Sequence, residues 1–130
     1  MTGHPIIFYA DDDSDDRTWV KESVLKKQPS AELKEFEDGT QLLHFLRNVP
    51  DVLPDLVILD INMPGMSGKD VLKELRNNSA WNSLKVVMFT NSAAEVDRLY
   101  AKSLNASFIT KPMSLEGIRK VADDLLKLCR

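Results

Sequence analysis

The chain has 130 residues, of which 43% are hydrophobic and 28% charged, and this fits one globular domain with a single sizeable core. The net charge of −3, without any block of Lys or Arg, gives no electrostatic basis for binding nucleic acid, and no apolar stretch approaches the ~20 residues of a membrane span. A single cysteine, Cys129, excludes an internal disulfide, and residues 1–5 lack a signal-peptide pattern, so we predict a cytoplasmic protein.

Five apolar runs predict β-strands, and the stretches between them have helical spacing. The predicted strands are 6–10, 33–36, 56–60, 84–90 and 106–110. The first helix is expected after a cap at Ser14 or Asp15, with Trp19, Val20 and Val24 at helical spacing. The other helices are expected from Gly39 to just before Pro50, over 68–76, over 93–104 with Val96, Leu99, Tyr100 and Leu104, and from Ser114 to Leu128.

This regular alternation predicts an α/β fold with a parallel sheet and helices on both of its faces. No linker or repeat interrupts the pattern, so we expect one compact domain. Right-handed crossovers place the carboxyl ends of all the strands at one edge of the sheet, which is where such sheets bind their ligands.

Chemically distinctive residues stand at four of these strand ends: Asp11-Asp12-Asp13, Asp60, Thr90-Asn91-Ser92 and Lys111. Carboxylates and a backbone carbonyl make a hard oxygen site that suits Mg²⁺. A hydroxyl and an ammonium complete what phosphoryl transfer requires, with an aspartate as the nucleophile. The two histidines, His4 and His44, lie away from this edge, so the base for acyl transfer is missing.

Each of these features also has a purely structural interpretation. An acidic turn before a helix usually caps that helix, Thr90 can simply end a strand, and Lys111 can be a solvated surface charge. Residues 63–68 can be an ordinary turn rich in Pro and Gly. The coincidence of all four groups at one edge favours function.

With these residues the chain resembles the receiver domain of bacterial two-component response regulators over essentially its whole length. The motif Leu59-Asp60-Ile61-Asn62-Met63-Pro64-Gly65-Met66-Ser67-Gly68 fits the family's pattern of a phospho-acceptor aspartate, Met-Pro and a helix-starting glycine. Asp11-Asp12, Thr90 and Lys111-Pro112 follow the family's order and spacing. The resemblance implies one receiver domain over 1–130, with a core of about 5–129 and a five-stranded, flavodoxin-like sheet in the order 2-1-3-4-5.

The resemblance also implies a role for each matching residue. Asp60 would accept a phosphoryl group from a phosphohistidine of a sensor histidine kinase or a histidine phosphotransfer protein. Mg²⁺ would be bound by Asp11, Asp12, Asp60 and the backbone carbonyl of Asn62. Thr90 and Lys111 would contact the phosphoryl group.

Positions beside these residues are expected to modulate the site. Phe108 stands at the family's aromatic switch position, although an ordinary packed strand aromatic explains it equally well. Asn91 is bulkier than the residue common there, so Asn91 and Ser92 are expected to govern access to the phosphoryl group. Asn105 replaces a frequent glycine and tolerates a positive φ. Asp13 is interpreted as a turn or cap residue rather than a ligand.

The chain stops at Arg130 after the last predicted helix, so we expect a stand-alone receiver that signals by docking or by passing its phosphoryl group onward. The acid-rich stretch 13–17 resembles receivers that partner phytochrome-like kinases. The expected docking surface is the face of helix 93–104, strand 106–110 and the last helix, which such domains also use for homodimers. We expect no nucleic-acid or membrane partner.

We expect a signalling module that promotes only its own phosphorylation and dephosphorylation, not an enzyme with an external substrate. A phosphatase of the haloacid dehalogenase type is the enzyme alternative, but its nucleophile ends the first strand and is followed by a second aspartate. A flavodoxin-like electron carrier needs a phosphate loop where Asp11-Asp12-Asp13 would repel the flavin phosphate. A degenerate receiver that serves only for interaction is the third alternative.

Overall fold

A five-stranded parallel sheet organises the protein, whose computed structural model describes residues 4–130. Residues 1–3 of the predicted domain lie outside the described residues. The strands are β1 (Ile6–Ala10), β2 (Glu32–Phe36), β3 (Leu56–Leu59), β4 (Val86–Thr90) and β5 (Ser107–Thr110). The helices are α1 (Ser14–Lys27), α2 (Gly39–Asn48), α3 (Gly68–Arg76), α4 (Glu95–Ser103) and α5 (Leu115–Leu128).

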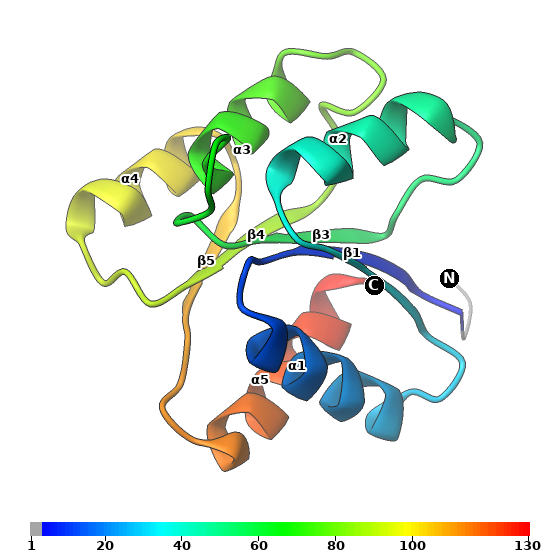
Figure 1. Ribbon diagram of the computed structural model, residues 1–130, viewed down its shortest axis with the longest axis vertical. Coiled ribbons are helices and arrows are strands. Elements are labelled where there is room, and N and C mark those ends of the chain that lie inside the picture. Colours follow the sequence, from blue (N-terminus) through cyan, green and yellow to red (C-terminus); the bar gives the residue numbers. More distant parts are fainter. Residues whose placement is uncertain (1–3) are drawn as a thin grey trace.

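The sheet has the order β2-β1-β3-β4-β5, and every neighbouring pair is parallel. The predicted fold class and strand order are therefore confirmed. Because all strands run the same way, their carboxyl ends share one edge, with β3 in the middle between β1 and β4 (Figure 1). Within residues 4–130 no helix combines the length and the apolar character that crossing a membrane requires.

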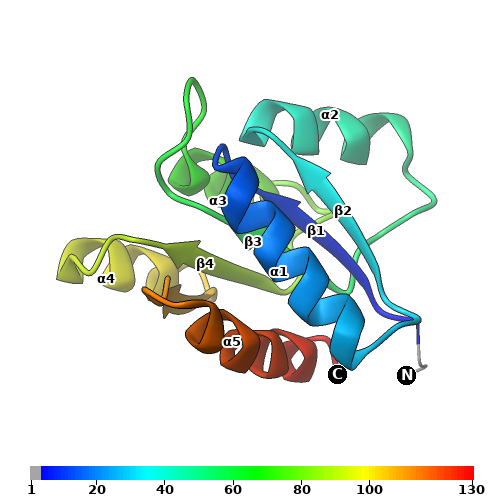
Figure 2. The same ribbon diagram turned by 60° about the horizontal axis from the view of Figure 1, so that its bottom comes forward.

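The two faces of the sheet carry separate cores, because alternate residues of a strand point to opposite sides. Ile7 and Tyr9 of β1 pack with α1 and α5, whereas Phe8 and Ala10 pack with the core under α2, α3 and α4. Figures 1 and 2 show α1 and α5 side by side on one face and the other three helices on the opposite face. Burial on both sides explains why the apolar runs of β1, β3 and β4 are continuous rather than alternating, whereas the edge strands β2 and β5 are partly exposed.

The strands β4 and β5 begin later than the sequence predicts. Leu84, expected to open a strand, lies in a turn, and the chain reaches β5 through Asn105 at a φ of 55°. The guanidinium of Arg76 donates hydrogen bonds to carbonyls that precede the two strands. Its Nη1 lies 2.9 Å from Leu84 O and its Nε lies 2.7 Å from Leu104 O. Arg76 thus ties the segments ahead of β4 and β5 to α3. The predicted tolerance of Asn105 for a positive φ is confirmed.

The cap of α1 is Asp13, so the predicted cap at Ser14 or Asp15 is wrong. The Asp13 carboxylate accepts from the backbone N–H groups of Asp15 at 2.9 Å and Asp16 at 3.1 Å. Asp13 has the extended backbone of a cap, whereas the helix already includes Ser14. The interpretation of Asp13 as a cap is confirmed.

Helix α4 is shorter and less covered than its apolar residues suggest. It starts at Glu95 rather than near Ala93, and its only buried residue is Ala101. Val96 is 67% exposed and Leu99 54% exposed, and Trp19 on α1 is also 39% exposed. Helical spacing identifies an apolar face, but it does not show whether another element covers that face.

Candidate functional site at the carboxyl edge of the sheet

The four predicted groups meet at the carboxyl edge because backbone hydrogen bonds continue past the strand ends. The N–H of Asp60 donates to Ala10 O at 3.1 Å, and the N–H of Lys111 donates to Thr90 O at 2.8 Å. These bonds fix the first residue after β3 against β1 and the first residue after β5 against β4. The side chains of Asp11, Asp60, Thr90 and Lys111 are consequently the buried polar groups of the described chain.

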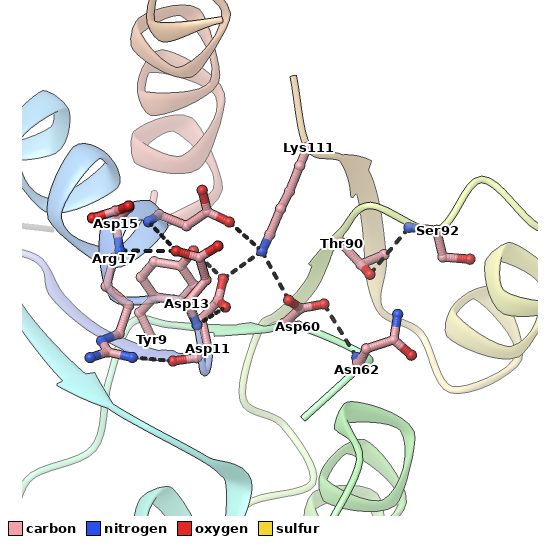
Figure 3. Close-up of polar contacts among 11 residues, drawn as sticks. Tyr9, Asp11, Asp13, Asp15, Arg17, Asp60, Asn62, Thr90, Ser92 and Lys111 are labelled. Atoms are coloured by element: carbon pink, nitrogen blue, oxygen red, sulfur yellow. Dashed lines mark hydrogen bonds and ion pairs between the residues drawn. The ribbon is translucent and has the colours of Figure 1, made fainter. Parts of the chain in front are cut away.

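Lys111 is the centre of this edge. Its Nζ lies 2.7 Å from Asp11 Oδ2, 2.7 Å from Asp16 Oδ2 and 2.9 Å from Asp60 Oδ2. Figure 3 shows the extended Lys111 side chain reaching Asp11 and Asp60. Burial alone would lower the pKa of Lys111, but the hydrogen bonds that its ammonium donates to these carboxylates outweigh burial and raise the pKa above the usual lysine range. Lys111 is therefore a buried cation, and the alternative interpretation of Lys111 as a solvated surface charge is wrong.

Asp11 is fully buried and held from three sides. Its Oδ2 accepts from the hydroxyl of Tyr9 at 2.7 Å, and its Oδ1 accepts from the N–H of Asp13 at 2.9 Å. Burial raises the pKa of Asp11 above its usual range, against the lowering effect of Lys111 and these donors. Burial beside Asp11 also raises the pKa of Tyr9, so the hydroxyl stays a donor.

Asp11, Asp12 and Asp60 could together hold a metal ion, because each offers a carboxylate oxygen and these oxygens lie within 4.8 Å of one another. Asp12 is exposed, whereas the other two are buried. Oxygen ligands of this kind suit a hard divalent cation, and a second positive charge would offset the excess of carboxylates around Lys111. The donor set therefore fits Mg²⁺. The structure places the N–H of Asn62 at 3.3 Å from Asp60 Oδ1, and the role of the Asn62 carbonyl stays a prediction.

The loop after Asp60 returns so closely that it requires a glycine. A Cβ added to Gly68 would lie 2.1 Å from the carbonyl oxygen of Asp60. The N–H of Gly68 donates to Ile61 O at 3.0 Å, and Ser67 with Asp70 forms a capping box that starts α3. The spacing from Asp60 to Gly68 is thus a consequence of packing α3 directly against the site.

Thr90 is fully buried at the end of β4, and its Oγ1 accepts the N–H of Ser92 at 3.3 Å. Thr90 and Ser92 lie on the other side of Asp60 from Asp11 (Figure 3). The Ser92 hydroxyl donates to Asp97 of α4, and Asp97 forms an ion pair with Lys69 of α3. The side chain of Asn91 is exposed. The predicted effects of Asn91 and Ser92 on access stay predictions.

Phe108 is half-buried on β5, opposite Met88 in the sheet register and two residues before the partner of Thr90. The guanidinium of Arg98 lies over its ring at 5.0 Å. This packing between α4 and the sheet agrees with either interpretation of Phe108, and its switch role stays a prediction.

Two residues of the site, Tyr9 and Asp16, were not predicted. Tyr9 stands two residues before Asp11 in the chain, so strand alternation could have placed it on the same side. Asp16 lies on the first turn of α1, and the only available signal was its membership of the acid-rich run from Asp11 to Asp16. Sequence spacing alone does not reveal that this carboxylate faces Lys111.

An α/β sheet of this order with an acidic group and a lysine at its carboxyl edge defines the class of receiver domains. The sequence matches the family model described as response regulator receiver domain over residues 7–123, so the chain belongs to that family. Membership implies a part in phosphorelay signalling.

Within this family the chain is similar to a cyanobacterial phytochrome response regulator, RcpA, and to the response regulator Rcp1. The crystal structure of the phosphorylated cyanobacterial phytochrome response regulator RcpA has a TM-score of 0.89 at 25% identity, covering 95% of this chain and 92% of RcpA. The Mn²⁺-bound form of the response regulator Rcp1 has a TM-score of 0.82 at 28% identity, covering 92% of this chain and 90% of the other. Rcp1 of Synechocystis is also a sequence relative, 26% identical over 92% of this chain and 85% of its own length.

A larger relative contains a similar segment. The sensor histidine kinase CheAY of Helicobacter pylori is 31% identical over 95% of this chain, which spans 15% of the kinase.

Proposed function

We propose that the chain is a phospho-acceptor module that takes a phosphoryl group on Asp60 from a phosphohistidine of a sensor histidine kinase or a histidine phosphotransfer protein. The observation that carries the proposal is the Lys111 ammonium, 2.9 Å from a buried Asp60 carboxylate that also belongs to the group of Asp11, Asp12 and Asp60. A carboxylate reacts with a phosphoryl donor only where cations neutralise the negative charges that it must approach.

The reaction is a transfer between two groups. A carboxylate oxygen of Asp60 forms a bond to phosphorus while the bond from phosphorus to the donor's imidazole nitrogen breaks, and the imidazole keeps that electron pair. Asp11, Asp12, Asp60 and the Asn62 carbonyl would hold Mg²⁺, which supplies positive charge to the phosphoryl oxygens when it is bound. Lys111 provides a second, fixed positive charge, and Thr90 provides a hydroxyl donor.

The phosphorylated form would be recognised through protein contacts. The proposed docking and homodimer surface is the face formed by α4, β5 and α5, and α4 carries the exposed apolar residues Val96 and Leu99. The link from Thr90 through Ser92 and Asp97 joins this face to the site. The module turns over no external substrate in this proposal.

Asp60→Asn tests the phospho-acceptor role. With acetyl phosphate and Mg²⁺, intact-mass measurement should show the addition of one phosphoryl group to the wild type and none to Asp60→Asn, because an amide cannot serve as the nucleophile. Asp51→Asn removes the same charge from an exposed loop and should behave like the wild type.

Equal labelling of the wild type and Asp60→Asn would contradict the assignment of Asp60. No labelling of either protein, together with no Mg²⁺-dependent response to beryllofluoride, would favour a degenerate receiver that serves only for interaction.

A further inference from the structure

One of the three carboxylates around Lys111 lies outside the group suited to a metal ion. A lysine ammonium has three N–H donors, and here Asp11, Asp16 and Asp60 each accept at 2.7–2.9 Å. Asp11 and Asp60 also belong to the cluster suited to a divalent cation, and Asp60 is the proposed acceptor of the phosphoryl group. Asp16 is not in that cluster, so among the three partners of Lys111 it is the one that neither the metal ion nor the phosphoryl group would engage.

Asp16 is free for this contact because it takes no part in capping α1. It stands three residues after the cap residue Asp13, where an acidic side chain commonly reaches back to the N–H of the cap residue. Asp70 does so on α3, where it accepts from Ser67 N. On α1, Asp11 Oδ1 already accepts the N–H of Asp13, at 2.9 Å. The Asp16 carboxylate therefore turns to Lys111 instead.

The backbone around Asp16 is fixed to the site from two directions. Its own N–H donates to the Asp13 carboxylate at 3.1 Å. The next residue, Arg17, donates to the carbonyl of Asp11 and pairs with Glu35 of β2 at 3.2 Å. The Asp16 side chain is only 17% exposed, so it is a held carboxylate and not a mobile surface charge.

We propose that Asp16 is a positioning residue, which keeps the Lys111 ammonium beside Asp60 when Asp11 and Asp60 are engaged in phosphoryl transfer. This inference rests on the proposed function. A lysine side chain is long and flexible, and a divalent cation bound by Asp11, Asp12 and Asp60 would repel the Lys111 ammonium. The fixed Asp16 carboxylate offsets this repulsion and retains one hydrogen bond to Lys111, so the donor is already in place for the phosphoryl oxygens.

The test compares Asp16→Asn with Asp15→Asn in the full chain. Both residues lie in the first turn of α1, and both substitutions remove one negative charge from its N-terminus, but Asp15 is exposed and its side chain has no contact with Lys111 among those described. With acetyl phosphate at saturating Mg²⁺, phosphorylation of Asp16→Asn should be roughly tenfold slower than that of Asp15→Asn because Lys111 is displaced. Mg²⁺ affinity, followed by calorimetry, should differ less than about threefold between the two.

A second measurement uses the protein without metal. Urea unfolding in EDTA is compared for Asp16→Asn, Lys111→Met and the double variant. The shifts in unfolding midpoint should be non-additive for this pair and additive when Asp15→Asn replaces Asp16→Asn, because Asp16 contacts Lys111 and Asp15 does not.

The outcomes separate the two proposals. A wild-type chain that accepts phosphoryl, with Asp16→Asn as fast as Asp15→Asn, would contradict the role of Asp16 alone. Additive shifts for Asp16→Asn and Lys111→Met would also contradict it. A wild-type chain that takes up no phosphoryl group would contradict the proposed function and this role with it.

Discussion

Lys111 makes the acidic edge of the sheet compatible with folding. Three aspartates face it within 2.9 Å, and Asp11 among them is fully buried. Removing one partner of a buried ion pair leaves uncompensated charge, which costs more than the pair itself contributes. The lysine is thus a structural counter-charge in the free protein as well as a proposed ligand of the phosphoryl group.

Lys111→Met should lower the free energy of unfolding by about 3 kcal/mol at pH 7 in EDTA, because the acids lose their shared cation. The pKa of Lys111 is raised in the folded protein, so its contribution is complete below the ordinary lysine pKa of about 10.4 and is lost only as the pH rises through the higher folded value. The difference between the wild type and the variant should therefore stay constant from pH 7 to pH 9 in urea titrations.

Adding Mg²⁺ provides the control for this prediction, because a divalent cation bound by the same acids should restore part of the lost stability. A variant as stable as the wild type in EDTA would contradict the counter-charge role of Lys111.

The site residues at strand ends could be predicted from the sequence, but a site residue that depends on contacts between elements could not. Asp60, Thr90 and Lys111 follow apolar runs directly, so parallel topology alone brings them to one edge. Asp16 comes from a helix, and its direction depends on Asp11 having taken the N–H of the cap residue Asp13. The competition of Asp11 and Asp16 for this N–H depends on the folded structure, so the spacing of residues in the sequence does not reveal it.

At the scale of elements, the position of α3 against the site depends on one residue, Gly68. Gly68 begins α3 against the carbonyl of Asp60, and a Cβ there would lie 2.1 Å from that oxygen. Gly68→Ala should lower the free energy of unfolding by about 3 kcal/mol, because the backbone of either the helix or the site has to move. Chemical denaturation of the variant measures this directly.

Gly65→Ala is the matched control in the same loop. Gly65 has a φ of 73° with nothing within 4 Å of an added Cβ, so this substitution should cost only about 1 kcal/mol of backbone strain. Equal losses for the two variants would show that the close approach of Gly68 to Asp60 does not matter for stability.

Helix α4 shows how far sequence patterns predict an element. Its apolar spacing correctly indicates a helix, but the helix starts at Glu95, after a cap residue, Ala94, that makes no side-chain hydrogen bond to it. Its position is instead tied by polar contacts: Ser92 and Lys69 both bind Asp97, and these hydrogen bonds lower the pKa of the Asp97 carboxyl. These polar contacts join different elements, so the hydrophobic periodicity of the helix does not predict them.

For the whole molecule, the exposed apolar side chains of α4 predict a change of assembly on activation. With beryllofluoride and Mg²⁺ the wild type should sediment as a dimer, because the proposed dimer surface includes α4, whose Leu99 is 54% exposed and apolar. Leu99→Lys should remain monomeric under the same conditions. Leu53→Lys, which changes a 46% exposed leucine in the loop before β3, should dimerise like the wild type.

Identical sedimentation of the wild type with and without beryllofluoride would contradict this prediction. Dimerisation of Leu99→Lys at the wild-type concentration would show that a different face is used.

The architecture was largely predictable, because strands buried on both faces and amphipathic helices leave strong apolar patterns. Ile7 and Tyr9 face one core while Phe8 and Ala10 face the other, so the run from Ile6 to Ala10 is continuous. The late start of β4 was not predictable from apolar content, since Leu84 is apolar and buried although it lies in the turn before the strand.

The two tryptophans give the molecule a built-in optical probe. Trp81 is buried in the core under α2, α3 and α4, whereas Trp19 is 39% exposed on α1, one turn after Asp16 and beside the same surface hollow as Pro112. Indole emission depends on the polarity around the ring, so we expect a rearrangement of Asp16 and Lys111 to change the emission of Trp19, while the buried Trp81 should change less. Tryptophan emission should therefore report the occupancy of the acidic edge in real time without an attached label.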